Sequence, residues 1–283
     1  MENVNKMKII KITIVLGLIA ALTILYARFI GTKGLIIKEY PIKTSYLSSE
    51  YDGFKIVHFT DLHYGSTIGI KELKNIVNKI NEQNPDLVIF TGDLIDEDYT
   101  LSDKEKEKVI NELKNITPHI ETMAVIGNHD YKDDSFNTIV ESLEWHFLDN
   151  TYEYVYNKSD KPIIFVGLDD LTKGEPDYEN AFSYLNEIEE DYYTIIITHE
   201  PDQIDKISNY NFNLYLCGHS HLGQVRVPLI GAIYTPKGSK KYYDEHYKVS
   251  NTDMYISGGL GTSTLKLRLF NHPSINLYRF YTK

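Results

Sequence analysis

Residues 54–63 read FKIVHFTDLH, a short apolar run that ends in polar residues. Residues 70–81 then repeat apolar side chains at helical spacing. A second apolar run, DLVIFT at 86–91, is followed by a charged amphipathic segment at 104–116 and a third run, TMAVI, at 122–126. This strand–helix–strand–helix–strand order predicts parallel strands joined by right-handed crossovers, and hence an α/β fold.

The second half of the chain repeats this alternation less regularly. Apolar runs at 163–168, 194–198 and 214–217 predict strands, and residues 178–189 predict a helix. Strands and turns dominate beyond Leu222, including strands expected at 254–257 and 275–280. Because the sequence has no internal repeat, the simplest expectation is one composite domain over residues 54–283.

The composition is globular, with an excess of acid. The chain of 283 residues has 29 Lys+Arg and 40 Asp+Glu, a formal net charge of −11. Phosphate-backbone affinity needs a surplus of basic residues, so nucleic acid is disfavoured as a partner. The single cysteine, Cys217, excludes an intrachain disulfide and a Cys-rich zinc fold. The composition does not decide the oligomeric state.

The N-terminus predicts a membrane anchor over residues 1–30. No residue between Ile12 and Ala27 is charged, and Lys11 and Arg28 lie near the ends of the apolar stretch. A helix of roughly 20 apolar residues spans a bilayer core, and basic residues at its ends can reach the interface. A cleaved signal peptide is the alternative, but this stretch is longer than usual and no small-residue cleavage site follows it.

Residues 31–53 read as a juxtamembrane linker that leads into an edge strand, with Gly31, Gly34 and Pro41 as turn residues. Basic residues lie on both sides of the span, so their distribution does not decide its orientation. A short basic N-terminal tail usually stays in the cytoplasm. We therefore expect a single-pass protein of the cell membrane with an extracytoplasmic catalytic domain.

Polar residues cluster where the predicted strands end. In chain order the five clusters read DLH at 61–63, GDLID at 92–96, GNHD at 127–130, THEP at 198–201 and GHSH at 218–221. Each cluster alone is as typical of a turn or a helix cap. The carboxyl ends of strands in an open α/β sheet form its ligand crevice, so five such clusters together predict a functional site at one edge.

The residue types of these clusters favour metal binding. Carboxylate oxygen, amide oxygen and imidazole nitrogen suit divalent manganese, iron or zinc, and no thiolate cluster is available. Asp93 could bridge two cations, and two neighbouring cations can hold the attacking and leaving oxygens of a phosphoryl displacement.

With these five blocks in this order, the sequence resembles the calcineurin-like metallophosphoesterase superfamily. The resemblance runs from Asp61 to His221 and implies a four-layer-type sandwich of two mixed β-sheets flanked by helices, here preceded by one transmembrane helix. GHSHLGQ at 218–224 and YISGGLGTSTLKLRLF at 255–270 are similar to a narrower bacterial, membrane-associated group, some of whose members hydrolyse UDP-diacylglucosamine-type lipid precursors. Leu222 replaces a glycine that most family members have there.

The resemblance also implies a role for each site residue. The first of two metal ions, with manganese favoured, would be held by Asp61, His63, Asp93 and His221. The second would be held by Asp93, Asn128, His199 and His219. His129, with Asn128, would contact the phosphate and protonate the leaving group, and Asp130 would orient the His129 imidazole.

The implied activity is hydrolysis of a phosphate ester or pyrophosphate, on a small molecule or a lipid-linked substrate, by attack of metal-bound hydroxide. A soluble-nucleotide phosphodiesterase without lipid preference is the alternative within the same chemistry. A metal-bearing scaffold without turnover would have lost ligands or His129, which this chain retains. Of the remaining residues, we expect His58 and Cys217 in the core and Arg268 in a surface salt bridge.

Overall fold

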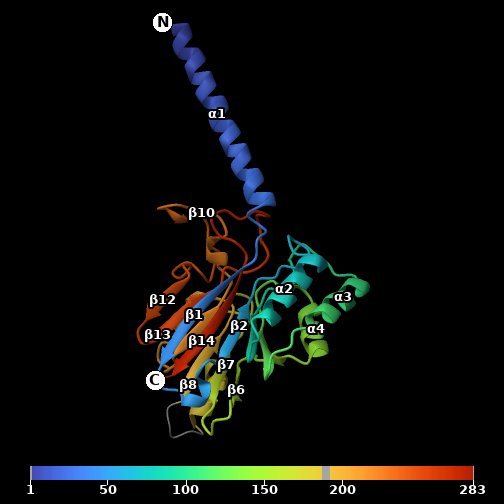
Figure 1. Cartoon of the computed structure of the whole chain (residues 1–283), viewed down its shortest axis with the longest axis vertical. Helices are drawn as coiled ribbons and strands as arrows, with labels where there is room; N and C mark the ends of the chain where they lie inside the picture. Colours follow the sequence, from blue (N-terminus) through green and yellow to red (C-terminus); the bar gives the residue numbers. More distant parts are fainter. Residues whose placement is uncertain (1, 187–191, 283) are drawn as a thin grey trace.

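The computed structural model describes residues 2–186 and 192–282. A long N-terminal helix, α1 (Glu2–Phe29), projects from a domain built on two six-stranded sheets (Figure 1). The side chains of α1 are exposed over almost its whole length, and the helix is long and apolar enough to cross a membrane. The expected anchor therefore forms one continuous helix whose apolar run is exposed.

The first sheet has the strand order β1-β14-β2-β3-β4-β5. Its strands are β1 (Ile36–Thr44), β14 (Ser274–Thr282), β2 (Lys55–Phe59), β3 (Leu87–Thr91), β4 (Glu121–Val125) and β5 (His146–Phe147). Strands β2 to β5 are parallel, as the sequence predicts, whereas β14 runs antiparallel to β2. The strand expected after the linker is β1, which lies at the sheet edge and pairs in parallel with β14 over nine residues.

The second sheet has the order β12-β13-β9-β8-β7-β6. Its strands are β12 (His246–Val249), β13 (Thr252–Ile256), β9 (Leu214–Cys217), β8 (Tyr193–Ile197), β7 (Ile163–Gly167) and β6 (Thr151–Val155). A short hairpin of β10 (Arg226–Val227) and β11 (Gly231–Ala232) stands apart from both sheets.

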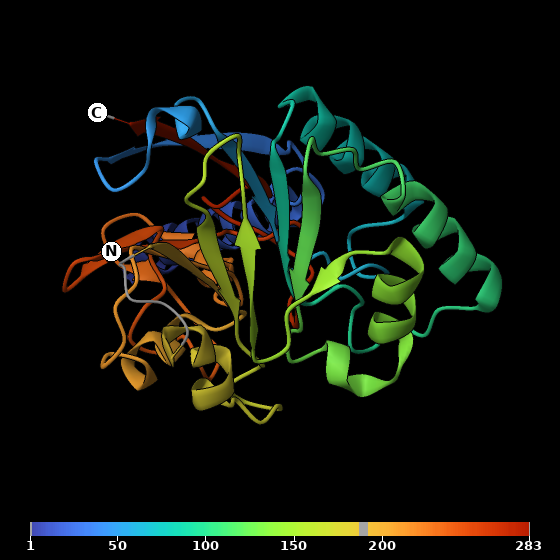
Figure 2. The same ribbon diagram turned by 90° about the horizontal axis from the view of Figure 1, so that it is seen from below.

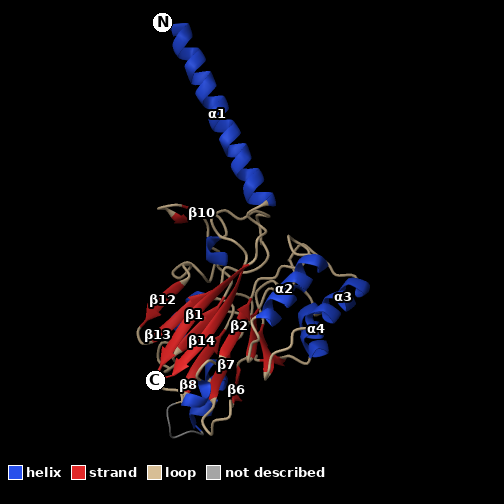
Figure 3. Cartoon of the chain, viewed as in Figure 1, coloured by secondary structure: helices blue, strands red, loops and turns tan. Residues whose placement is uncertain are grey.

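The two sheets pack face to face, with helices on the outer faces (Figure 2, Figure 3). Alternate side chains explain the layers, because successive residues of a strand point to opposite faces. In β3, for example, Leu87 and Ile89 face the core between the sheets, whereas Val88 and Phe90 face the helices. The helices on that side are α2 (Ile70–Glu82), α3 (Asp103–Leu113) and α4 (Ser135–Leu143).

The outer face of the second sheet is covered by short helical segments and loops. The helix expected over 178–189 is shorter: α5 (Tyr178–Ala181) gives way to a 3₁₀ turn, Ser183–Asn186. Residues 187–189 of that expectation lie outside the described residues. A shorter helix suffices here, because Phe182 and Tyr184 already cover this outer face of the sheet.

Candidate metal centre

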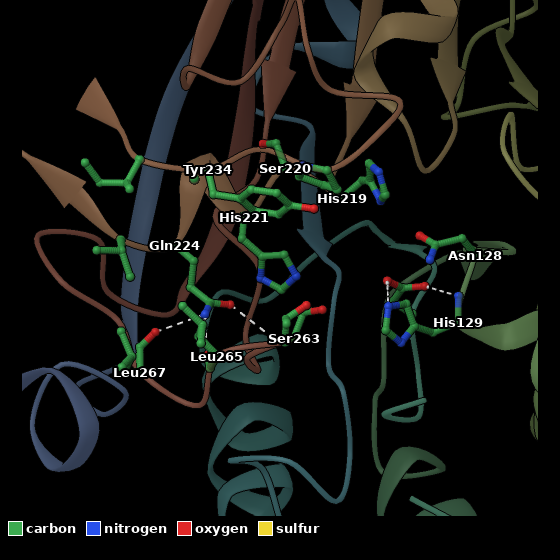
Figure 4. Close-up of a pocket in the computed structure, with 16 residues that line it drawn as sticks. Asn128, His129, His219, Ser220, His221, Gln224, Tyr234, Ser263, Leu265 and Leu267 are labelled. Carbon is green, nitrogen blue, oxygen red and sulfur yellow. Dashed lines mark hydrogen bonds and ion pairs between the residues drawn. The ribbon is translucent and has the colours of Figure 1, made fainter. Parts of the chain in front are cut away.

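All five predicted clusters lie at one edge of the two packed sheets, where β2, β3 and β4 of the first sheet and β8 and β9 of the second reach their carboxyl ends. Parallel strands bring residues that are far apart in sequence to the same edge. In Figure 4, Asn128 and His129 lie on one side of the site and His219 and His221 on the other. The structure thus places the predicted residues on two facing walls.

One group of candidate ligands consists of Asp61, His63 and His221, whose donor atoms all lie within 4.8 Å of one another. The Nε2 atoms of His63 and His221 are 3.1 Å apart. Asp61 Oδ1 is 3.3 Å from His221 Nε2. All three side chains are buried, so this polar group faces inward and not toward solvent.

A second group consists of Asp93, His199 and His219. His199 Nε2 lies 3.2 Å from Asp93 Oδ2 and 3.1 Å from His219 Nδ1. The same Asp93 oxygen is 3.5 Å from His63 Nε2 of the first group. Asp93 therefore stands between the two groups, where one carboxylate can serve both.

The far nitrogens of two imidazoles are fixed by backbone carbonyl groups. His199 Nδ1 donates to the carbonyl oxygen of Thr91 at 2.7 Å, and His219 Nε2 donates to that of Lys237 at 2.7 Å. A carbonyl oxygen can only accept, so these nitrogens carry the protons and the opposite nitrogens face the site. Such second partners are typical of metal-binding histidines.

Asn128 and His129 follow β4 and lie beside Asp93, which follows the neighbouring strand β3. The buried Oδ1 atom of Asn128 has no hydrogen-bond partner among the described residues. The backbone N–H of His129 donates to Asp93 Oδ1 at 2.8 Å, and its ring Nε2 lies 4.0 Å from Asp93 Oδ2. An unpartnered buried amide oxygen beside a carboxylate fits a further ligand for a cation.

We expected Asp130 to orient the His129 imidazole, but its carboxylate contacts backbone amides instead. Its carboxylate accepts hydrogen bonds from the backbone N–H groups of Asp93, Leu94 and Gly127, at 2.8, 2.8 and 3.0 Å. The carboxylates within ion-pair distance of the His129 ring, each at 4.0 Å, are instead those of Asp93 and Glu97 among the described residues. Asp130 therefore joins two loops and does not orient the imidazole.

Several site residues have a left-handed backbone, which side-chain-bearing residues rarely adopt. The φ angles of Asp61, His63, Asp93, His219 and His221 are 50°, 42°, 59°, 62° and 47°. Strained residues of this kind persist only where the surrounding structure fixes them, and they gather at functional sites. The backbone is thus shaped to turn five donor side chains into one space.

The electrostatics of the site centre on Asp93. Burial would raise its pKa, but the imidazoles of His199 and His129 hold that pKa well below its ordinary value. Burial would likewise lower the pKa of His199, yet Asp93 raises it well above the ordinary range. Burial lowers the pKa of His63 to about 3, which keeps this imidazole neutral at pH 7. An ionised carboxylate among buried imidazoles is a donor set suited to divalent cations.

The sequence matches the family model of the calcineurin-like phosphoesterases over residues 54–223. The chain belongs to this family. Calcineurin-like phosphoesterases use dinuclear divalent metal centres and are hydrolases, and the two groups around Asp93 are candidate ligand clusters for such a centre.

Relatives of this calcineurin-like phosphoesterase are found in bacteria and vertebrates. The uncharacterized metallophosphoesterase YkuE of Bacillus subtilis (strain 168) is 34% identical over 89% of this chain and 88% of its own. Phosphodiesterase YaeI of Escherichia coli (strain K12) is 28% identical over 79% of this chain and 81% of its own. A transmembrane protein with a metallophosphoesterase domain from Danio rerio is 24% identical over 93% of this chain and 61% of its own. Together with α1, the last similarity fits membrane association.

Among solved structures, TT1561 of Thermus thermophilus has the same fold. It superposes with a TM-score of 0.50 at 15% identity, over 74% of this chain and 90% of that one. This likeness agrees with the two mixed sheets flanked by helices that the resemblance implies.

The sequence prediction for Arg268 is wrong. The side chain is fully buried and has no carboxylate at ion-pair distance among the described residues. Its Nε and Nη2 atoms donate to the carbonyl oxygen of Gly261 at 3.0 and 2.6 Å, and Nη2 lies 3.3 Å from His221 Nδ1. Arg268 thus supports the first ligand group from behind. The only sequence signal was the Gly-rich turn at 258–261, which follows β13 as the other clusters follow their strands.

A cavity of about 290 Å³ adjoins the two ligand groups of this calcineurin-like phosphoesterase. Its polar end is lined by Asp93, Asn128, His129 and the two histidines of the GHSH block. Its other end is mostly apolar, with side chains from the loops at 223–236 and 263–267 (Figure 4). The cavity can therefore hold a charged group beside the candidate ligands and an apolar group beyond them.

Proposed function

We propose that this calcineurin-like phosphoesterase uses two divalent cations, with manganese favoured, to hydrolyse a phosphate ester or pyrophosphate of a lipid-linked substrate. The position of Asp93 between two groups of buried imidazoles carries the proposal. UDP-linked diacylated sugar precursors are one substrate class of this kind.

The ligand assignment follows the two groups, extended by Asp93 and Asn128. The first cation would be held by Asp61, His63, Asp93 and His221, and the second by Asp93, Asn128, His199 and His219. When bound, the cations would supply Lewis-acid activation of water and neutralise charge on the phosphoryl group.

The residues of the chain divide the remaining tasks. His129 lines the cavity next to Asp93 and is placed to give a proton to the departing oxygen of the substrate. Asn128 lines the same part of the cavity and would contact the phosphoryl group. Asp130 acts through the backbone, because its carboxylate accepts hydrogen bonds from three backbone N–H groups and so holds the loops of Asp93 and His129 together.

The lipid part of the proposal rests on α1 and on the apolar end of the cavity. In this proposal residues 1–30 anchor the chain in the cell membrane, 31–53 form the linker and edge strand, and 54–283 form an extracytoplasmic catalytic domain. A substrate with an apolar tail would then be hydrolysed at the membrane surface.

The metal-dependent chemistry is tested by comparing Asp93→Ala with His129→Ala in the full-length protein. We expect Asp93→Ala to lose bound manganese and all turnover, because it removes the carboxylate shared by both groups. His129→Ala should retain manganese, measured by elemental analysis, and turn over about 10²–10⁴-fold more slowly, the usual contribution of a proton donor. Retained metal and activity in Asp93→Ala would refute the shared role.

The substrate class is tested with a panel of an aryl phosphomonoester, an aryl phosphodiester, a cyclic nucleotide and a UDP-sugar lipid. Full-length protein and a chain lacking residues 1–30 are compared on each compound. Preference of the full-length protein for the lipid supports the proposal. Equal hydrolysis of the nucleotide by both chains, with none of the lipid, favours the soluble-nucleotide alternative.

A further inference from the structure

We infer that an apolar surface beside the anchor seats in the interfacial layer of a lipid bilayer. This surface, which we call the apolar rim, belongs to the β10–β11 hairpin and to the loop at 265–270. Its members are Leu229, Ile230, Ile233, Tyr234, Leu265 and Phe270, all of them exposed. Leu229 and Ile230, at the hairpin tip, have lost little or none of their accessible surface, at 108% and 73%.

The loop that carries Leu265 and Phe270 is attached to the C-terminal end of α1. The backbone N–H of Arg268 donates to the carbonyl oxygen of Ala27 at 2.9 Å. Gly31 packs against the backbone of Arg268 so closely that a side chain there would meet the Arg268 carbonyl oxygen. Ala27 is buried near the end of α1, so the loop meets the helix where the apolar run ends.

The hairpin is attached to the same loop. Arg226 N–H donates to the Leu269 carbonyl oxygen at 3.0 Å, and Leu269 N–H donates to that of Gln224 at 3.2 Å. Hairpin, loop and helix end are therefore one hydrogen-bonded unit. In Figure 1 the hairpin lies at the end of the domain nearest α1, remote from η1 (Ser49–Tyr51).

This unit stands at the level of the bilayer interface. If the apolar run of α1 fills the hydrocarbon core, residues near Ala27 and Ile30 lie at its boundary. Leu265 and Phe270 are three and two residues from Arg268, hence within about 10 Å of that boundary for an extended chain. Amphipathic segments sit at this depth, with apolar side chains in the boundary between headgroups and acyl chains.

The charges of the unit favour a lipid surface over an acidic or basic protein. The ten residues 227–236, VPLIGAIYTP, carry no charge in a chain whose net charge is −11. Exposed Lys33 and Lys266 and half-buried Arg28 flank the surface, as suits anionic headgroups. The Arg226 guanidinium beneath the hairpin is neutralised by Asp244 at 2.6 Å.

Docking of the apolar rim would place the cavity mouth against the bilayer. Ile233, Tyr234 and Leu265 belong to the rim and also line the cavity. A substrate with an acyl chain could then reach the candidate metal centre without leaving the membrane. This consequence rests on the proposed lipid-linked substrate, whereas the docking itself rests only on the proposed membrane anchor, α1.

The test measures the depth of a spin label in full-length protein, one copy per nanodisc of phosphatidylcholine and phosphatidylglycerol. Leu229→Cys is labelled with a nitroxide; the natural Cys217 is buried and does not compete. Tyr46→Cys, exposed and beyond the far end of β1, is the matched control. Accessibility to molecular oxygen and to a water-soluble nickel chelate is compared.

We expect the Leu229→Cys label to gain oxygen accessibility and lose nickel accessibility relative to the Tyr46→Cys label. Phe270→Cys, on the other segment of the rim, should shift in the same direction, which guards against a local effect of one label. Equal nickel accessibility at all three positions would overturn the proposal. Shielding that occurs only in vesicles with many copies would also overturn it, because a second copy and not lipid would then cover the surface.

A second experiment measures the turnover of a soluble and a vesicle-borne substrate by a variant of the apolar rim. Ile230→Asp lies outside the cavity lining and should leave hydrolysis of a soluble aryl phosphate unchanged. Turnover of a vesicle-borne UDP-sugar lipid should fall. If no lipid is hydrolysed by any variant, the proposed substrate class fails while the depth measurement still decides the docking.

Discussion

Single residues fix the site through contacts that are distant in sequence. Asp93 gathers imidazoles from four segments of the chain, and the carboxylate of Asp130 accepts hydrogen bonds from the amides of two loops. Both carboxylates are buried, where an unmet hydrogen-bonding group is costly. The consequences of altering one atom should therefore be large and measurable.

Asp130→Asn should destabilise the protein by about 1–3 kcal/mol. One oxygen of the carboxylate becomes an NH₂ group, which would face a backbone N–H that now donates to it. Urea denaturation of full-length protein in detergent measures the change. Asp133→Asn is the control, because Asp133 is exposed and its carboxylate accepts from Ser135 N–H within reach of solvent. Equal stability of the two variants would contradict this account of Asp130.

His58 should make the fold sensitive to acid. It is fully buried between Thr91 and Tyr278, and burial lowers its pKa from the ordinary 6.5 to about 3. The unfolded chain therefore binds the proton first as pH falls. The stability contributed by neutral His58 is complete above pH 6.5 and is lost progressively between pH 6.5 and 3.

Between about pH 7.5 and 5 the wild type should lose about 2 kcal/mol more free energy of unfolding than His58→Gln. The variant lacks the titrating group, while the other histidines are common to both chains and cancel in the comparison. Urea unfolding at the two pH values gives the difference. Parallel losses in both proteins would show that His58 does not carry the effect.

At the scale of elements, the strands are supports and the turns after them carry the chemistry. Gly92, directly after β3, has a φ of 89° and lies against the backbone of Gly127, which follows β4. An added Cβ would stand 2.5 Å from Gly127 N and 2.6 Å from its Cα. The two turns can therefore approach each other only through glycine.

Gly92→Ala should abolish metal binding and lower stability, because backbone atoms cannot yield as a flexible side chain can. Gly53→Ala is the matched control: its φ is 80°, but none of the described residues other than its two chain neighbours lies within 4 Å of the added Cβ. That variant should lose only about 1 kcal/mol, the cost of the left-handed backbone. Manganese content and melting temperature distinguish the two, and equal losses would contradict the close approach.

The sequence predicted elements well where the signal was local. Buried strands such as β3 and β9 are uninterrupted apolar runs, and the helix at 70–81 differs from α2 by one residue. Hydrogen bonds between residues that are far apart in the chain leave no such signal in the sequence. Two of the three amide partners of Asp130, those of Asp93 and Leu94, lie in another loop, and Arg268 is held by a carbonyl that any residue could present. The β1–β14 pairing was equally invisible, because hydrophobic pattern does not specify a distant partner.

At the scale of the whole molecule, the segment that follows the anchor is part of the first sheet of the catalytic domain. The linker from α1 leads directly into β1, which pairs with β14 along nine residues and contributes Ile42 and Tyr40 to the core between the sheets. A soluble form must therefore keep residues 36–44.

A chain lacking residues 1–30 should remain folded, whereas one lacking residues 1–44 should unfold or aggregate. The second deletion removes β1 and exposes the edge of β14 together with Tyr278. Circular dichroism and size-exclusion chromatography compare the two. Identical monomeric profiles and melting temperatures would show that β1 is dispensable.

The β1–β14 ladder has a consequence for biosynthesis. β14 begins 230 residues after β1 ends. At about 5–20 residues per second, the ribosome would need on the order of 10–50 s to supply the partner strand. Throughout that interval the first strand has no partner and lies close to the point where α1 enters the membrane. The nascent polypeptide should therefore depend on chaperones until its final strand has been synthesised.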